Sequence, residues 1–294
     1  MTSIYTHKDA NIRRTWAIFT IFLIVVIGVG FLFTQIYQDP TIIIFASIFA
    51  IAMSFFSFWF SDKVVLSMAK AKPVTRENGR ELYNIVENLS ITAGLPVPRI
   101  YIMEEAQMNA FATGRDAKHA VIAFTTGLLE KLDRSEIEAV AAHELSHIGN
   151  RDMLVSTMVV VMVGFIAILS DIFLRSMWFR GGDRKNSNQV MLLIGIVFAI
   201  LAPIAATLMK LAISRKREFL ADASGALLTR YPEALANALE KLDADKTPMK
   251  IANNSTAHLW VDDPFNGMKK TPFLHKLFMT HPPIQDRIKA LRGQ

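Results

Sequence analysis

Four apolar stretches without a charged residue dominate the pattern of the chain. They cover residues 16–36, 41–60, 153–170 and 190–209. As helices, each is long enough to cross about 30 Å of hydrocarbon. Residues 37–40 form a short turn between the first two. The pattern therefore predicts four transmembrane helices.

The third and fourth stretches are shorter, and helices buried in a protein core are the alternative for them. The polar segment 171–189 between them favours a transmembrane hairpin with a flexible loop. Trp16, Tyr37 and Trp59 lie where aromatic residues meet a membrane surface. Basic residues before the first stretch, without a small-residue cleavage site after it, are typical of an uncleaved signal anchor.

The distribution of lysine and arginine predicts the orientation. The segments near the membrane ends on the side of residues 1–15 carry 13 of these residues, and the two loops opposite carry 4. Because basic residues accumulate on the cytoplasmic side, the larger segments are predicted to face the cytoplasm.

Outside the apolar stretches the sequence indicates mixed α and β structure. A helix is expected over residues 75–92, and short strands over 99–103, 109–113 and 119–124. Gly114-Arg115-Asp116 would join the last two strands as a hairpin of a small antiparallel sheet. The expected domains are listed in chain order: two transmembrane helices (1–62), the first catalytic part (63–152), a transmembrane hairpin (153–213) and the second catalytic part (214–294).

Composition supports a membrane protein and excludes some chemistry. The chain is 52% apolar with a mean hydropathy of +0.30, and it has no cysteine. A thiol nucleophile or a thiolate metal site is therefore excluded. The net charge of +6 is interpreted as basic residues near anionic lipid headgroups, because no basic stripe interleaved with aromatics points to nucleic acid.

A metal-binding motif lies just before the third apolar stretch. His143 and His147 are one helical turn apart and can bind one Zn²⁺, with Glu144 beside them as general base. Ser135 and Glu138 suggest a capping box at the start of this helix. A solvated helix with two incidental histidines is the alternative.

Catalytic zinc requires a third protein ligand, and Glu218 is the candidate. A third histidine of the extended motif is missing, since its position is Met153. Glu218 and Asp222 are one helical turn apart, so Glu218 can bind the metal while Asp222 orients a ligand histidine. A surface helix with paired charges is the alternative for this segment. His147 would lie about 9 Å from the third apolar stretch along a continuous helix, and Glu218 about 13 Å from the fourth. An antiparallel hairpin would thus place the ligands at similar height above the bilayer.

Four segments in this order resemble the HtpX family of membrane zinc metalloproteases, which are related to the prenyl-protein (CAAX) endopeptidases. They read NAFATG, HELSHIGNRD, EFLADASG and THPPIQDRI. The resemblance covers nearly the whole chain. It implies a mainly α fold, with four transmembrane helices and a cytoplasmic zincin-type α+β metalloprotease domain. It also implies one zinc ion per chain bound by His143, His147 and Glu218, with Glu144 as the catalytic base.

Other residues receive supporting roles in this interpretation. The run Asn109, Ala110, Phe111 and Ala112 is expected to be an edge strand that pairs with an extended substrate. His281 would donate to the oxyanion, and Arg287 would stabilise that region. An ordinary hairpin strand and a surface turn are the alternatives for these two segments.

The resulting hypothesis is an endopeptidase of the bacterial inner membrane that cuts misfolded or damaged membrane proteins for quality control. Its partners would be unfolded polypeptides and the lipid bilayer, without nucleic acid. An intramembrane protease is disfavoured because the motif helix is rich in charged residues. A catalytically silent scaffold or holdase is the non-enzymatic alternative, and an intact Glu144 disfavours it. A transporter is disfavoured by the uncharged spans.

Overall fold

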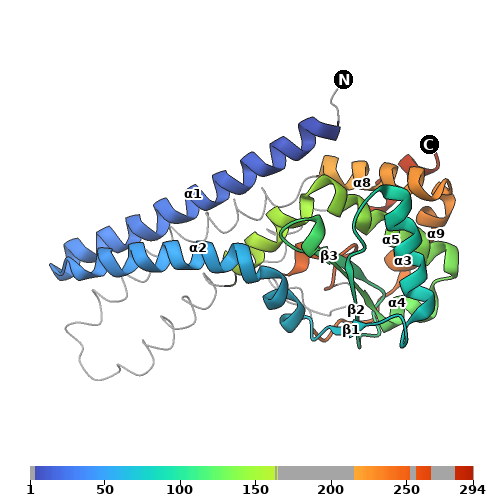
Figure 1. Cartoon of the computed structure of the whole chain (residues 1–294), viewed down its shortest axis with the longest axis horizontal. Helices are drawn as coiled ribbons and strands as arrows, with labels where there is room; N and C mark the ends of the chain where they lie inside the picture. The colour runs from blue at the N-terminus through green and yellow to red at the C-terminus, as the bar shows by residue number, and fades with distance from the viewer. Residues whose placement is uncertain (1–3, 163, 165–214, 252–255, 266–281, 294) are drawn as a thin grey trace.

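Two long helices at the N-terminus project together from a compact domain (Figure 1). The computed structural model describes residues 4–162, 164, 215–251, 256–265 and 282–293. Helix α1 (Ile4–Tyr37) and helix α2 (Thr41–Met68) are antiparallel, and Asp39 closes the turn by accepting a hydrogen bond from the Thr41 amide at 2.9 Å. Both are long and apolar enough to cross a membrane, over Thr15–Gln35 and Thr41–Met68. The first two predicted spans are therefore found as helices.

The third predicted span is described only in its first part. Asp152–Met162 is an apolar helix, and its Val155 and Val159 are fully buried in a cluster with Ile18 and Phe22 of α1. The beginning of this stretch thus packs against the first helix. The rest of the predicted third span, the loop after it and the predicted fourth span lie outside the described residues.

The sheet of the compact domain is mixed, with the order β1-β2-β4-β3. Its strands are β1 (Lys72–Val74), β2 (Arg99–Met103), β3 (Ala110–Thr113) and β4 (Val121–Thr125). Strands β3 and β4 form the predicted antiparallel hairpin, through a 3₁₀ turn at Ala117–His119. However, β4 lies between β3 and β2 and runs parallel to β2. The prediction of an antiparallel sheet was therefore wrong, because periodicity within strands does not reveal where a hairpin inserts.

Helix α5 (Arg134–Asn150) lies at the centre of the domain core. Its small and branched apolar residues Ala139, Val140, Leu145 and Ile148 are fully buried. They pack with helix α3 (Arg80–Ala93), with helix α9 (Pro232–Ala244) and with the sheet, while short helix α4 (Thr126–Lys131) precedes α5. Helix α8 (Arg215–Thr229) crosses α5, and α11 (Ile284–Leu291) packs against α9. The core thus holds the motif helix rigidly.

Both ends of α5 differ from the sequence-based expectation. The capping box is formed by Asp133 and Glu136 instead of Ser135 and Glu138, and the Ser135 hydroxyl donates to Asp133. The helix does not continue into the third apolar stretch, because Arg151 has a φ of 59° and ends it. The helix expected from residue 75 begins only at Arg80.

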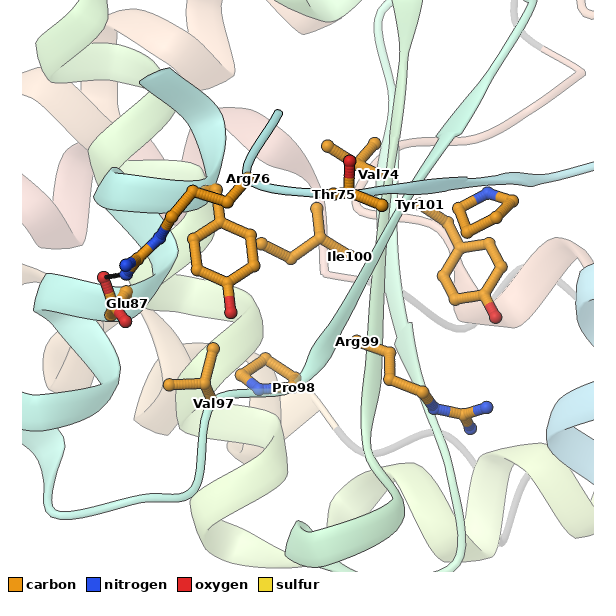
Figure 2. Close-up of a pocket in the computed structure, with 11 residues that line it drawn as sticks. Val74, Thr75, Arg76, Glu87, Val97, Pro98, Arg99, Ile100 and Tyr101 are labelled. Atoms are coloured by element: carbon orange, nitrogen blue, oxygen red, sulfur yellow. Dashed lines mark hydrogen bonds and ion pairs between the residues drawn. The ribbon is translucent and has the colours of Figure 1, made fainter. Parts of the chain in front are cut away.

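A groove of about 640 Å³ lies between α3 and the β1–β2 edge of the sheet (Figure 2). Arg76 and Glu87 form an ion pair on one side of it, and Tyr83 and Tyr101 also line it. None of its lining residues is a candidate metal ligand. The groove lies along the β1 edge of the sheet, and β3 forms the opposite edge.

Candidate metal centre

Two histidines of α5 converge at the base of the candidate site. The Nε2 atoms of His143 and His147 are 3.2 Å apart. A tetrahedral zinc ion with bonds of about 2.0–2.1 Å holds two nitrogen ligands about 3.3 Å from each other. The spacing of the two imidazoles therefore suits one zinc ion.

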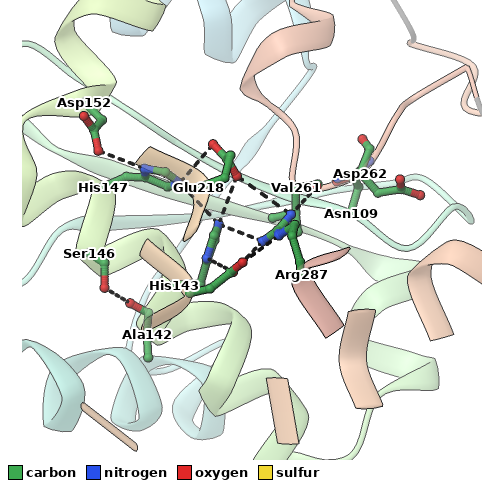
Figure 3. Close-up of polar contacts among 11 residues, drawn as sticks. Asn109, Ala142, His143, Ser146, His147, Asp152, Glu218, Val261, Asp262 and Arg287 are labelled. Carbon is green, nitrogen blue, oxygen red and sulfur yellow. Dashed lines mark hydrogen bonds and ion pairs between the residues drawn. The ribbon is translucent and has the colours of Figure 1, made fainter. Parts of the chain in front are cut away.

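Helix α8 supplies the third group, Glu218. One of its carboxylate oxygens lies 3.8 Å from Nε2 of His143, and the other lies 3.8 Å from Nε2 of His147. One donor atom from each of the three residues lies within 4.8 Å of the other two (Figure 3). Two imidazoles and one carboxylate are a ligand set of catalytic zinc sites. The structure thus brings the three predicted ligands together in an arrangement that fits zinc.

A close helix crossing makes this arrangement possible. A Cβ atom added at Gly225 of α8 would lie 3.0 Å from the backbone nitrogen of His143 and 3.1 Å from its Cα. Only a residue without a side chain lets the two backbones approach so closely without displacement. Gly225 therefore sets the distance between α8 and the histidines of α5.

A buried ion pair orients His143. Its Nδ1 lies 3.0 Å from Asp222, and Arg287 holds Asp222 with a two-pronged contact at 2.7 and 2.8 Å. Burial alone would raise the pKa of Asp222, but the Arg287 charge lowers it to about 2, so Asp222 stays ionised. A carboxylate at Nδ1 fixes the histidine tautomer that leaves Nε2 free for a metal. The predicted orienting role of Asp222 matches this geometry.

Arg287 is buried next to the candidate metal ligands. It is fully buried, and besides Asp222 it donates to the carbonyl of Val261 at 3.3 Å. Its Nη2 also lies 3.4 Å from Nε2 of His143, and its Nη1 lies 3.8 Å from a carboxylate oxygen of Glu218. Arg287 therefore contacts two of the three candidate ligands directly, besides holding Asp222. His281 lies outside the described residues, so its role stays a prediction.

Asp152 is the counterpart of Asp222 for the second histidine, and the motif analysis gave it no role. Its carboxylate lies 3.2 Å from Nδ1 of His147. Burial lowers the pKa of His147, but Asp152 and the Glu218 charge together raise it to about 9. A metal ion would displace the proton, because only neutral imidazole binds metals. The available signal was a carboxylate five residues after His147, within HELSHIGNRD.

Glu144 is buried beside the three ligands. It is 2% exposed, and burial raises its pKa to about 7. The backbone amide of Ala112 donates a hydrogen bond to it and opposes this shift. A carboxyl group with a pKa near neutrality can both accept and return a proton, which suits a general base.

Strand β3 forms the predicted sheet edge next to Glu144. The Ala110 carbonyl accepts a hydrogen bond from the Val261 amide at 3.1 Å, so a loop covers this part of the edge. Residues two apart direct their backbone groups to the same side of a strand, which places the Ala112 amide on this edge as well. The Phe111 side chain lies in the core, where its ring packs edge-to-face against Trp260.

Asn109 does not offer its side chain to a ligand. It is completely buried, and its amide group bonds to the backbone of Asp262 in both directions, at 2.9 and 3.2 Å. The structure thus shows Asn109 fixing the loop after Trp260, where a substrate contact was predicted.

A helix-borne group of two histidines and a glutamate, with a buried glutamate at a sheet edge, defines a metal-dependent peptidase. The model of peptidase family M48 matches residues 76–294. Two proteins described as Protease HtpX homologs are similar over most of their length. The one from Caldanaerobacter subterraneus is 43% identical, with 99% of this chain and 98% of the relative covered. The one from Pyrococcus furiosus is 46% identical, with 90% of each covered. The chain belongs to peptidase family M48.

A solved structure of S. mikatae Ste24p is similar in fold. The TM-score is 0.50 at 20% sequence identity, with 94% of this chain and 66% of that chain covered. The chain thus spans slightly less than two thirds of that protein. This likeness supports the fold of the chain.

Proposed function

We propose that the chain is a membrane-anchored zinc endopeptidase that hydrolyses peptide bonds of misfolded or damaged membrane proteins. The observation that carries the proposal is the convergence of His143, His147 and Glu218 around one point, with Glu144 buried beside them. One zinc ion held by these ligands would polarise the scissile carbonyl and activate a water molecule.

Glu144 performs the proton transfers in this proposal. It takes a proton from the attacking water and later delivers it to the nitrogen of the leaving amine. A pKa of about 7 lets the same carboxyl group serve in both directions near neutral pH. Burial of the site excludes bulk water and strengthens these electrostatic effects.

Strand β3 is the proposed place for the substrate backbone. An extended peptide can add to a sheet edge by main-chain hydrogen bonds. The amide of Ala112 already contacts Glu144, so a peptide at this edge would present its carbonyl next to the base. Unfolded segments suit such binding because their backbone is free to pair.

Two apolar helices support anchoring in a membrane, and the basic residues near the membrane ends support a catalytic domain that faces the cytoplasm. In a bacterium this corresponds to the inner membrane. Substrates would then be cytoplasmic parts of membrane proteins that have lost their fold.

The decisive comparison uses the purified full chain and its Glu144→Gln variant, with bound zinc and cleavage of casein or an unfolded membrane protein as readouts. Both should bind about one zinc ion per chain, and only the unmodified protein should cleave. The matched control is Glu138→Gln, the same change on α5 at a partly exposed position outside the metal-ligand group. This control should retain cleavage. Zinc without cleavage in all three would favour a silent scaffold, and absence of zinc from all three would refute the proposal.

A further inference from the structure

A second groove lies where α2 enters the catalytic domain. It has a volume of about 660 Å³. One wall comes from α2 and carries Phe55, Trp59 and Phe60. The other comes from the first residue of β2, Arg99, and from the segment between β3 and β4. This groove shares no lining residue with the candidate metal ligands, and it shares only Arg99 with the groove beside α3.

The wall from α2 is aromatic and exposed. Phe55, Trp59 and Phe60 are 62%, 42% and 38% exposed, and they continue the exposed apolar face of the same helix that includes Phe45 and Ile48. They lie at the end of an apolar stretch long enough to cross a membrane. Aromatic side chains at this position are typical of the membrane–water interface. The wall thus suits acyl chains and the glycerol region of a lipid.

A layer of cations lies directly above the aromatic wall. Lys63 is one helical turn, or about 6 Å, beyond Trp59. Its ammonium group lies 5.2 Å from the centre of the Phe60 ring, and the guanidinium of Arg115 lies 4.6 Å from that of Trp59. Lys118 lines the same groove and is exposed.

The two arginines of this layer are each paired with a carboxylate. Arg99 pairs with Asp62 at 2.6 Å, and Arg115 with Asp116 at 3.5 Å. His119 lies between Arg115 and Asp116: its Nε2 accepts a hydrogen bond from Arg115 at 2.7 Å, and its Nδ1 donates to the Asp116 carboxylate at 2.7 Å.

The two lysines account for the excess positive charge. Within the parts of the chain that the structure describes, no carboxylate forms an ion pair with Lys63 or Lys118. The groove therefore has two positive charges available for a ligand.

We propose that this groove binds the phosphate group of an anionic phospholipid, with Lys63 and Lys118 as its main contacts. The lipid tails would lie along the exposed aromatic face of α2. An aromatic wall continuous with an apolar helix, below unpaired lysines, complements an anionic headgroup on acyl chains. Free phosphate would contact only the two lysines and would leave the aromatic wall uncovered. The inference rests on the membrane anchoring contained in the proposed function.

Binding here would tie the catalytic domain to the membrane surface. Arg115, Lys118 and His119 belong to the connection between β3 and β4, and β3 carries the Ala112 amide that contacts Glu144. A lipid held by this connection and by α2 would fix the candidate substrate edge relative to the bilayer. Such a lipid would be a structural ligand and would take no part in the chemistry.

The test uses the full chain with zinc, reconstituted in phosphatidylcholine with or without phosphatidylglycerol, and native mass spectrometry of the lipids that it retains. The unmodified protein should retain phosphatidylglycerol in preference to phosphatidylcholine. Lys63→Gln/Lys118→Gln should weaken this retention about 30-fold, or about 2 kcal/mol for two lysines near an anionic surface. The matched control is Lys250→Gln/Lys289→Gln, which removes the same charge at exposed positions outside the groove and should retain the lipid.

Equal retention by both double variants, whether high or low, would overturn the lipid site. Displacement of phosphatidylglycerol by inorganic phosphate at comparable concentration would also overturn it and indicate a phosphate site instead. Casein cleavage in detergent separates this inference from the proposed function. Selective retention without cleavage would refute the protease and leave the lipid site standing. Failure of the unmodified chain to remain in vesicles would remove the anchoring, and the lipid site with it.

Discussion

Replacement of Gly225 by alanine tests whether the close crossing of α8 and α5 positions the metal ligands. The added methyl group would lie 3.0 Å from the His143 backbone nitrogen and 3.1 Å from its Cα. These atoms belong to a buried helix that packs against the sheet and two further helices. Because no flexible side chain can give way, α8 must shift by a few tenths of an ångström, and Glu218 shifts with it.

Two opposing terms determine the effect on stability. Alanine is favoured over glycine within a helix by about 1 kcal/mol. Overpacking of a core costs about 1–3 kcal/mol. The free energy of unfolding should therefore fall by no more than about 2 kcal/mol, and the variant should fold.

The shift of Glu218 should also lower the activity. A misplacement of about 1 Å can cost about 100-fold in rate, so a shift of about 0.3 Å should cost about 4-fold in kcat/KM. Zinc affinity should also fall, since Glu218 moves relative to His143 and His147. The measurements are casein cleavage, zinc affinity by chelator competition, and denaturant unfolding.

Gly149→Ala is the matched control on the motif helix itself. A Cβ at Gly149 would meet only the end of the Leu95 side chain, at 3.6 Å, which is an ordinary contact. This variant should gain about 1 kcal/mol in stability and keep its activity. Equal activity and equal zinc affinity in the two glycine variants would show that the crossing at Gly225 does not position the ligands.

Three further predictions concern single polar contacts. Asp152→Asn should weaken zinc affinity about 10- to 100-fold, because it removes the carboxylate at Nδ1 of His147; unchanged affinity in chelator competition would refute that role. Arg287→Met should lower the free energy of unfolding by about 3–5 kcal/mol, because Asp222 is left buried without its partner; denaturant unfolding measures this, and a loss below about 1 kcal/mol would contradict it. Burial raises the pKa of Asp245, but hydrogen bonds from Thr247 and Met108 lower it to about 2. A lowered pKa stabilises the fold above about pH 4, and this contribution is lost as the pH falls towards about 2. Asp245→Asn should therefore destabilise the protein at neutral pH and progressively less below about pH 4, and a loss independent of pH would exclude this origin.

The parts of the site that follow from local spacing could be predicted from the sequence. His143, Glu144 and His147 share one helix, and Glu218 and Asp222 share another, so a period of 3.6 residues already determines which of them face the same way. The first two spans and the strand Arg99–Met103 were equally accessible, because their apolar runs have clear ends.

Contacts between segments distant in the sequence could not be predicted in the same way. The two hydrogen bonds from Arg287 to Asp222 join residues 65 positions apart. The hydrogen bonds between Asn109 and the Asp262 backbone join residues 153 positions apart. Asn109 was expected to contact the substrate, and Arg287 was expected to stabilise the region around the oxyanion. In the folded chain they are buried and hold other groups in place, which depends on packing that no local pattern reports.

The end of the motif helix shows how one backbone angle changes the chemistry of the site. The third apolar stretch begins only three residues after the end of α5 at Asn150, so a continuous helix was predicted. On a continuous helix, residues five apart do not share a face, and Asp152 would point away from His147. The left-handed conformation of Arg151 breaks the helix and redirects the chain, which brings the Asp152 carboxylate to 3.2 Å from Nδ1 of His147. The same turn thus ends the helix and brings the Asp152 carboxylate to the second candidate metal ligand.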